Sequence, residues 1–159
     1  MQDLQDEAWP DLGGRIEADE AGSVHRLPIR VYFEDTDFSG VVYHASYVRW
    51  CERGRSDFLR LLGNNHDALF QGVDGHEPAF FVVRRITCDF LKPARMDDVL
   101  MVETRAGEVG SASLVVHQHI KRGGRTICEA EMTLVLISSS GKPQRISQRL
   151  RTALSVKVP

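Results

Sequence analysis

Hydrophobic and polar residues alternate in the segment that begins at His25. Ile29, Val31 and Phe33 are apolar or aromatic, and arginine and glutamate occupy positions between and after them. An alternation with a period of two residues is typical of a strand that has one buried and one exposed face. We therefore predict a strand that begins at His25 and ends at Asp35.

The pattern changes to a helical period a few residues later. Apolar residues recur at steps of three and four with charged residues between them, which predicts an amphipathic helix over residues 46–62. Gly63 and Asn64 are stop signals, and residues 64–78 have the composition of a loop. Gly54 lies inside this helix, where glycine costs about 1 kcal/mol relative to alanine, so we expect a close packing contact there. The helical positions that carry the pattern are Tyr47, Trp50, Cys51, Gly54, Phe58 and Leu61.

The C-terminal half of the chain shows further strand patterns separated by turn signals. Gly123 and Gly124 are a strong two-residue hairpin signal, so these strands should be antiparallel neighbours. Residues 148–154 have the pattern of a short terminal helix. Together with the first strand, the pattern predicts an α+β fold in which one long helix covers a five-stranded antiparallel sheet. The four later strands are predicted at residues 79–91, 98–108, 111–121 and 125–138.

Length and composition narrow the class of protein. A chain of 159 residues is long enough for one domain with a full core and short for two. Hydrophobic residues make up 42% and charged residues 26%, and no apolar run reaches the roughly 18 residues that span a bilayer. The N-terminus lacks the basic start and apolar stretch of a secretory signal, so we expect a cytoplasmic protein without membrane insertion.

Charge is distributed unevenly along the chain. Residues 1–24 hold seven acidic residues and one arginine, a net charge of −6, so the overall net charge of −2 leaves +4 on residues 25–159. Residues 1–24 lack an apolar period and are predicted to form a flexible acidic arm, whereas residues 25–159 form the folded domain. The mildly basic charge of the folded domain suits an anionic small molecule such as a nucleotide-bearing thioester. It is too small and too dispersed for a nucleic-acid binder, so nucleic acid is not expected as a partner.

The three cysteines are predicted to be inert core residues. Cys51, Cys88 and Cys128 are far apart, odd in number and set in no C-x-x-C pattern, which argues against a disulfide framework or a zinc site. Each lies within a helix or strand pattern rather than in a turn, as expected for a buried thiol.

The link between the first strand and the helix, residues 34–50, concentrates candidate chemical groups. Asp35 and Asp37 precede Gly40, and His44 follows just before the helix. A turn that leads into a helix presents unpaired backbone N–H groups and the positive end of the helix dipole, which favour a carbonyl oxygen or an oxyanion. Asp37 and His44 would flank that oxygen.

Two metal-binding interpretations of this link are weakened by spacing. The residues D-T-D-F-S-G match the start of an EF-hand loop, but the twelfth position holds Ser46 instead of a bidentate glutamate, and a strand pattern precedes the loop. A transition metal would need Asp35, Asp37 and His44, with His25 as a fourth ligand. No ligand pair at helical spacing supports this set, and Asp-Thr-Asp before a glycine is common in turns. We therefore predict no metal.

The third interpretation is metal-free acyl chemistry. The Asp37 carboxylate can attack a thioester carbonyl or deprotonate a water molecule, because a thiolate is a good leaving group. Backbone N–H groups of residues 43–46 would meet the carbonyl oxygen, and His44 would orient the carbonyl or the water. Structural roles compete: Asp35 is favoured as a turn or cap residue, Asp37 fits an Asx-turn equally well, and Tyr43 fits the core.

Two stretches of the sequence, D-T-D-F-S-G-V-V-Y-H-A-S-Y-V-R-W and F-L-K-P-A-R-M-D-D, resemble a known family. They are similar to the hot-dog-fold thioesterases of the 4-hydroxybenzoyl-CoA thioesterase family, most closely the Tol-Pal-associated acyl-CoA thioesterase branch. The resemblance covers residues 25 to about 153. It implies a hot-dog fold, in which the sheet wraps around one long central helix, and it raises Asp37 and His44 above their structural alternatives.

The resemblance also implies roles for these residues. Asp37 falls on the family's nucleophile or general base, and His44 falls on the histidine of the Tyr-His pair that distinguishes this branch. The oxyanion contact, a backbone N–H at the start of the helix, falls on His44 itself. Substrate contacts fall on the turn and the residue after it, which are Gly40, Val41, Val42 and Tyr43.

The activity implied is hydrolysis of an acyl-CoA, or of an acyl carrier protein thioester, by a homodimer or homotetramer without metal or cofactor. Two alternatives stay open. One is an aromatic, hydroxybenzoyl-type acyl-CoA hydrolase, and the other is a hot-dog protein that binds acyl-CoA without hydrolysing it. Asp37 and His44 are both present, which counts against the second alternative.

Overall fold

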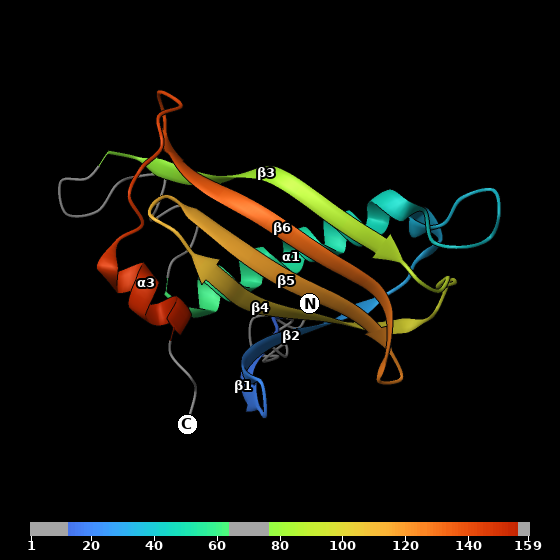
Figure 1. Ribbon diagram of the computed structural model, residues 1–159. Helices are drawn as coiled ribbons and strands as arrows, with labels where there is room; N and C mark the ends of the chain where they lie inside the picture. Colours follow the sequence, from blue (N-terminus) through green and yellow to red (C-terminus); the bar gives the residue numbers. More distant parts are fainter. Residues whose placement is uncertain (1–12, 64–76, 156–159) are drawn as a thin grey trace, which may run out of the picture.

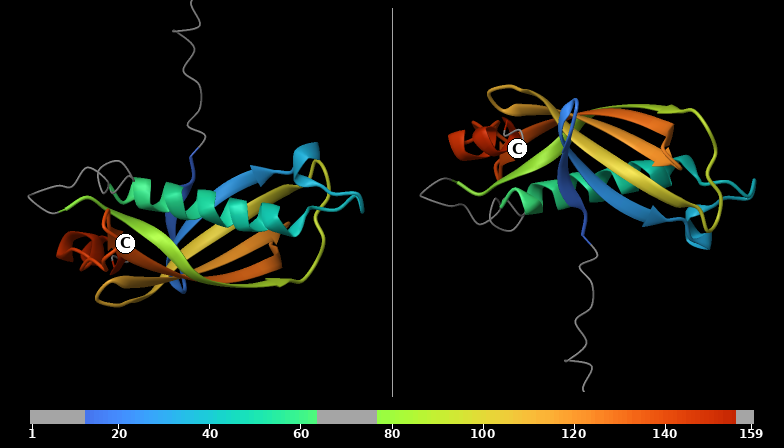
Figure 2. Two further views of the ribbon diagram at one scale, coloured as in Figure 1. Left: turned by 90° about the horizontal axis from the view of Figure 1, so that it is seen from above. Right: turned by 90° about the horizontal axis from the view of Figure 1, so that it is seen from below.

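A computed structural model describes residues 13–63 and 77–155 of the chain. Within these residues, six strands form one antiparallel sheet in the order β1-β2-β4-β5-β6-β3. Figure 1 shows the sheet curving around the long helix α1, and Figure 2 shows the helix lying along its concave side. This is the predicted hot-dog arrangement. The elements are β1 (Arg15–Asp19), β2 (Gly22–Arg30), a short 3-10 helix η1 (Phe33–Asp35), α1 (His44–Leu61), β3 (Ala79–Phe90), β4 (Val99–Val109), β5 (Ser113–Arg122), β6 (Arg125–Ser138) and α3 (Gln148–Ser155).

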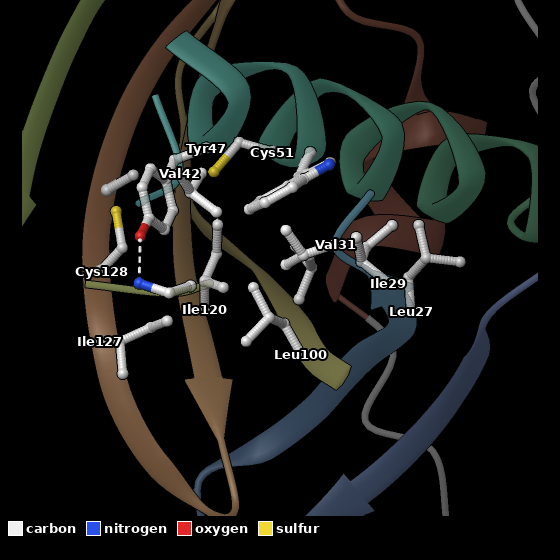
Figure 3. Packing of buried hydrophobic residues seen from close by; sticks show 14 of the residues in the cluster. Leu27, Ile29, Val31, Val42, Tyr47, Cys51, Leu100, Ile120, Ile127 and Cys128 are labelled. Atoms are coloured by element: carbon white, nitrogen blue, oxygen red, sulfur yellow. Dashed lines mark hydrogen bonds between the residues drawn. The ribbon is translucent and has the colours of Figure 1, made fainter. Parts of the chain in front are cut away.

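The core lies between the helix and the concave face of the sheet. Around the N-terminal half of α1, Tyr47, Trp50 and Cys51 pack against apolar side chains of β2, β4, β5 and β6 (Figure 3). Around its C-terminal half, Phe58 and Leu59 share a second cluster with residues of β5, β6 and α3. Because these side chains come from alternate strand positions and from one stripe of the helix, the period of the sequence determines which face is buried.

The predicted helix and late strands are confirmed with small shifts of their ends. Helix α1 begins at His44, two residues earlier than predicted, and β6 has the predicted bounds. Gly123 and Gly124 have φ angles of 54° and 80°, the pair of positive values that a two-residue hairpin requires. The predicted loop at residues 64–78 falls mainly outside the described residues.

The first strand ends earlier than predicted. Strand β2 ends at Arg30, and residues 33–35 form η1, which the Asp35 carboxylate caps by accepting the N–H of Tyr32 at 2.8 Å. Val31 still bonds to the residue just before β4, donating to the Asp98 carbonyl at 2.9 Å, and the chain then turns into η1. The alternation of apolar and polar residues in the sequence therefore extends beyond Arg30, where the strand itself ends.

Strand β1 lies inside the segment predicted to be a flexible arm, so that prediction is wrong for residues 15–24. The strand pairs with β2 from Arg15 to Asp19, which adds a sixth strand to the five predicted. Its acidic side chains are neutralised across the sheet, because Glu17 pairs with Arg26 and Asp19 pairs with Arg105. Residues 1–12 of the predicted arm lie outside the described residues.

The close contact expected at Gly54 is present, and two of the three cysteines are buried as expected. A Cβ on Gly54 would lie 2.9 Å from the Thr104 hydroxyl and 3.0 Å from a Val102 methyl, so the helix and β4 are in close contact there. Cys51 and Cys128 are buried free thiols and Cys88 is half-buried. Among the described residues, no helix has the length and apolar character needed to cross a bilayer.

Candidate active site

The link between β2 and α1 is held on one side by the backbone of Asp35. The Asp35 carbonyl accepts the N–H of Tyr43 at 2.8 Å and the hydroxyl of Ser46 at 3.3 Å. Its carboxylate caps η1. Asp35 is therefore the turn and cap residue that was favoured on the sequence, and it fixes where the helix begins.

The other side of the link is held by Ala94, in the connection between β3 and β4. The Ala94 carbonyl accepts the N–H of Val42 at 2.8 Å, and the Ala94 N–H donates to the hydroxyl of Tyr47 at 3.1 Å (dashed line in Figure 3). All three residues are buried. We call these two bonds the Ala94 clamp, since they tie the start of α1 to a segment almost fifty residues away.

Asp37 lies at the tip of the link with its side chain exposed. Its Oδ1 atom accepts the N–H of Ser39 at 2.8 Å and also accepts the Ser39 hydroxyl. These hydrogen bonds, and to a smaller extent the nearby His44 imidazole, lower the pKa of Asp37 below its ordinary value. The carboxylate is thus ionised at neutral pH and accessible to a substrate.

His44 is the first residue of α1, and its ring is exposed between two aromatic rings. The Tyr43 ring centroid lies 4.4 Å from that of His44, and the Phe90 ring, at the end of β3, lies 6.1 Å from it in a T-shaped arrangement. Tyr43 and Phe90 are 47% and 48% exposed, so both present apolar surface beside the histidine. Tyr43 is therefore not the plain core residue that was one of its two predicted roles.

Backbone N–H groups at the start of α1 are available for an oxyanion. The N–H groups of Gly40, Val42 and Tyr43 are engaged within the fold, but those of His44 and Ala45 have no acceptor in the part of the chain that the structure describes. They lie at the positive end of an 18-residue helix. The geometry thus narrows the predicted oxyanion contact to His44 and Ala45.

The predicted substrate contacts divide into two groups. Gly40, with a φ angle of 78°, and Val41 form the turn that carries Asp37, and the Tyr43 ring flanks His44. The Val42 side chain is buried in the core, so Val42 positions the link rather than facing a substrate.

The structure does not bring together the ligand set of the transition-metal interpretation. His25 is fully buried and its Nε2 lies 2.7 Å from the Asp57 carboxylate near the far end of α1, about 20 Å along the helix from His44. No three histidine, cysteine or acidic side chains in the described ranges are grouped to hold a metal ion.

Four residues of the site were not identified from the sequence: Ser39, Tyr47, Phe90 and Ala94. Tyr47 carries a helical apolar pattern, which does not reveal that its hydroxyl is an acceptor. Phe90 and Ala94 are distant in sequence and meet the link only through the sheet. The F-L-K-P-A-R-M-D-D stretch was the available signal, because it contains both.

A sheet wrapped around one long helix is the hot-dog arrangement. The start of that helix presents backbone N–H groups without acceptors among the described residues, together with an exposed carboxylate and a histidine. The sequence matches the thioesterase superfamily over residues 39–129. The chain therefore belongs to the thioesterase superfamily, and the reaction class of that family is thioester hydrolysis. His44 lies within the matched residues, and Asp37 lies two residues before them.

Individual relatives agree with this membership. The chain is 41% identical to the acyl-CoA thioester hydrolase YbgC of Escherichia coli O6:H1 over 116 residues, which is 72% of this chain and 83% of the relative. It is 34% identical to the acyl-CoA thioesterase YbgC of Haemophilus influenzae over 128 residues, 80% of this chain and 91% of that one. A crystal structure named "Probable Thioesterase" from Bartonella henselae has a TM-score of 0.75 and 44% identity, and the match covers 78% of this chain and 99% of the other.

Proposed function

We propose that the protein hydrolyses acyl-CoA thioesters, with Asp37 as the nucleophile or general base and His44 as the group that orients the carbonyl or the attacking water. One arrangement of chemical groups at the start of α1 supports this proposal most directly. An exposed, ionised Asp37 carboxylate stands close to the start of α1, where the N–H groups of His44 and Ala45 have no acceptor among residues 13–63 and 77–155. The similarity to relatives named as acyl-CoA thioester hydrolases supports the choice of substrate.

The reaction needs few groups because the leaving thiolate is stable. The Asp37 carboxylate adds to the thioester carbonyl carbon, or removes a proton from a water molecule that adds in its place. The carbonyl oxygen becomes negative and is stabilised by the N–H groups of His44 and Ala45 and by the helix dipole. The C–S bond then breaks, and the thiolate leaves and takes a proton from solvent. If Asp37 is the nucleophile, water hydrolyses the resulting anhydride.

We infer that the protein belongs to the Tol-Pal-associated branch rather than to the hydroxybenzoyl-specific one. The Tyr43-His44 pair that distinguishes this branch is present, and His44 lies in the site between two aromatic rings. Its exposed position at the helix start is consistent with contact to the carbonyl or to water. We also place the protein in the cytoplasm, a reducing compartment suited to its three free thiols.

We further propose that two chains pair through β3, in a homodimer that can stack into a homotetramer. Within the described residues, β3 pairs only with β6, so the other edge of this 12-residue strand is open. Three large apolar side chains are exposed on it, Val83, Ile86 and Phe90. Long, apolar edges are normally covered, and β1 at the other edge is short and charged by contrast.

Thiol release from a panel of thioesters tests the activity. The panel should contain straight-chain acyl-CoAs of several lengths, a benzoyl-type acyl-CoA and an acyl carrier protein thioester, each measured with and without a chelator. We expect turnover of acyl-CoA that the chelator does not change. Saturable binding of every thioester without thiol release would favour the non-catalytic alternative, and turnover of the benzoyl substrate alone would favour the aromatic one.

Light scattering on the full chain tests the assembly. The wild-type protein should have the mass of a dimer or tetramer, and an Ile86→Asp variant should shift to a smaller species because a carboxylate cannot be buried unpaired at the seam. A Val135→Asp variant changes a half-buried residue of β6, away from the open edge, and serves as the control. A wild-type monomer would contradict the proposal.

A further inference from the structure

Ser39 makes contacts with Asp37 that the turn does not need for its closure. The turn is closed by the backbone, since Gly40 N–H donates to the Asp37 carbonyl at 3.0 Å and Asp37 N–H donates to the Val41 carbonyl at 3.0 Å. In addition, both the N–H and the hydroxyl of Ser39 donate to Oδ1 of the Asp37 side chain. The neighbours thus hold the main chain of Asp37, and Ser39 holds its carboxylate.

Two donors on one oxygen make the two carboxylate oxygens different. Oδ1 is occupied by Ser39, whereas Oδ2 receives no hydrogen bond from the described part of the chain. The Asp37 side chain is exposed, so without these bonds its terminal torsion would be broad and either oxygen could face a substrate. Hydrogen bonds to a charged acceptor are stronger than neutral ones and therefore suited to restrict that torsion.

We propose that Ser39 is a positioning residue for the reaction: it holds Oδ1 of Asp37 so that Oδ2 is the atom presented to the thioester or to the attacking water. Fixing a reacting group before the substrate arrives removes an entropic part of the barrier. The inference rests on the proposed function, because it requires Asp37 to be the reacting carboxylate. It adds a residue that neither the matched motif nor the sequence pattern assigned.

Removing the Ser39 hydroxyl has a defined electrostatic consequence. The side-chain bond from Ser39 is the largest cause of the lowered pKa of Asp37, and the backbone bond from Ser39 is the next. Ser39→Ala deletes the first and keeps the second, so the pKa of Asp37 should rise. A serine that only stabilised the turn would change the unfolding free energy and leave the pH dependence of turnover unchanged.

The experiment compares three variants with the wild-type protein. Ser39→Ala removes the hydroxyl, and Ser39→Thr restores one at the same position. Ser56→Ala is the matched control, because Ser56 also donates its hydroxyl to an exposed carboxylate, that of Glu52, on the surface of α1. For each protein, the carbon-13 signal of the Asp37 carboxyl is titrated by NMR, and kcat and KM for an acyl-CoA are measured across pH.

We expect Ser39→Ala to move both the Asp37 titration and the acidic limb of the kcat/KM profile to higher pH. On the plateau, kcat should fall by about two- to tenfold, the effect of one lost hydrogen bond on a reacting group, while KM stays close to the wild-type value. Ser39→Thr should restore the wild-type limb, and Ser56→Ala should not move it.

The outcomes separate this inference from the proposed function. An unchanged Asp37 titration in Ser39→Ala would overturn the inference, since the hydroxyl would then not act on the carboxylate. A shifted titration with an unshifted kinetic limb would mean that Asp37 is not the carboxylate whose ionisation limits turnover, which would overturn its role in the proposed function. A shifted titration and limb with an unchanged plateau kcat would overturn the positioning role alone and leave the proposed function intact. A wild-type protein that titrates normally but hydrolyses no thioester would overturn the proposed function, and the positioning role with it.

Discussion

Replacing Tyr47 with phenylalanine should destabilise the protein through a single hydrogen bond. The Tyr47 hydroxyl accepts the N–H of Ala94 at 3.1 Å, inside the Ala94 clamp that holds the start of α1. Tyr47 is 4% exposed and Ala94 is fully buried. Water therefore cannot replace the hydroxyl without a rearrangement, and the variant leaves a buried N–H without an acceptor.

The magnitude follows from that orphaned group. An unsatisfied buried donor costs about 1–3 kcal/mol, and the ring of phenylalanine keeps the remaining contacts with Trp50 and Phe90. Burial raises the pKa of the Tyr47 phenol, so the hydroxyl is a neutral acceptor throughout the working range of pH and no charge is lost. We therefore expect a loss of about 1–3 kcal/mol in the free energy of unfolding.

Urea denaturation followed by circular dichroism measures this loss, at one fixed protein concentration because assembly would add to stability. Tyr43→Phe is the control: it makes the same chemical change four residues earlier, on a ring that is 47% exposed and outside the clamp. The control should stay within about 0.5 kcal/mol of wild type. A Tyr47→Phe variant as stable as the control would refute the reasoning.

Three further predictions concern packing, thiols and pH. Gly54→Ala should destabilise the fold despite the better helix propensity of alanine, because the added Cβ would lie 2.9 Å from the buried Thr104 hydroxyl. Urea denaturation measures the expected loss in the free energy of unfolding. Burial raises the pKa of Cys51 and Cys128 to about 12, so a thiol-specific disulfide reagent should modify neither until the protein is unfolded. Burial lowers the pKa of His25 in the folded protein below its ordinary value of 6.5. As the pH falls, the His25 imidazole is therefore protonated in the unfolded chain before it is protonated in the folded protein, and the free energy of unfolding should fall below about pH 6.5. Denaturation at several pH values measures this decline. In a His25→Phe variant the free energy of unfolding should fall less steeply with decreasing pH, and a decline as steep as in the wild type would exclude His25 as its cause.

The sequence predicted those parts of the fold that repeat a period. Helix α1 and strand β6 have strong patterns, and the Gly123-Gly124 hairpin has two glycines, which adopt positive φ angles without steric strain. Strand β1 was missed because its side chains are mostly charged. Its pairing depends on Arg26 and Arg105, which come from other strands, and a local period cannot report such partners.

The sequence predicted the part of the candidate site whose residues are close together along the chain. Asp37, His44 and the helix start lie within eight residues, so a turn signal followed by a helix pattern was sufficient to locate them. The Ala94 clamp and the Phe90 ring come from the β3 end and the β3–β4 connection, and they meet the link only after the sheet has closed around the helix. Ser39 lies only two residues after Asp37, yet its effect on the Asp37 carboxylate depends on side-chain geometry, which spacing along the sequence does not reveal.

The central claim is that Asp37 performs the chemistry, and its asparagine variant tests that claim most directly. Asp37→Asn keeps the size of the side chain and removes its charge. Asp35→Asn makes the same change two residues away, on the side chain that caps η1. With an acyl-CoA substrate, we predict that Asp37→Asn lowers kcat by about a hundredfold or more while KM changes little, and that Asp35→Asn keeps most of the wild-type rate. Wild-type turnover by a folded Asp37→Asn protein would contradict the account.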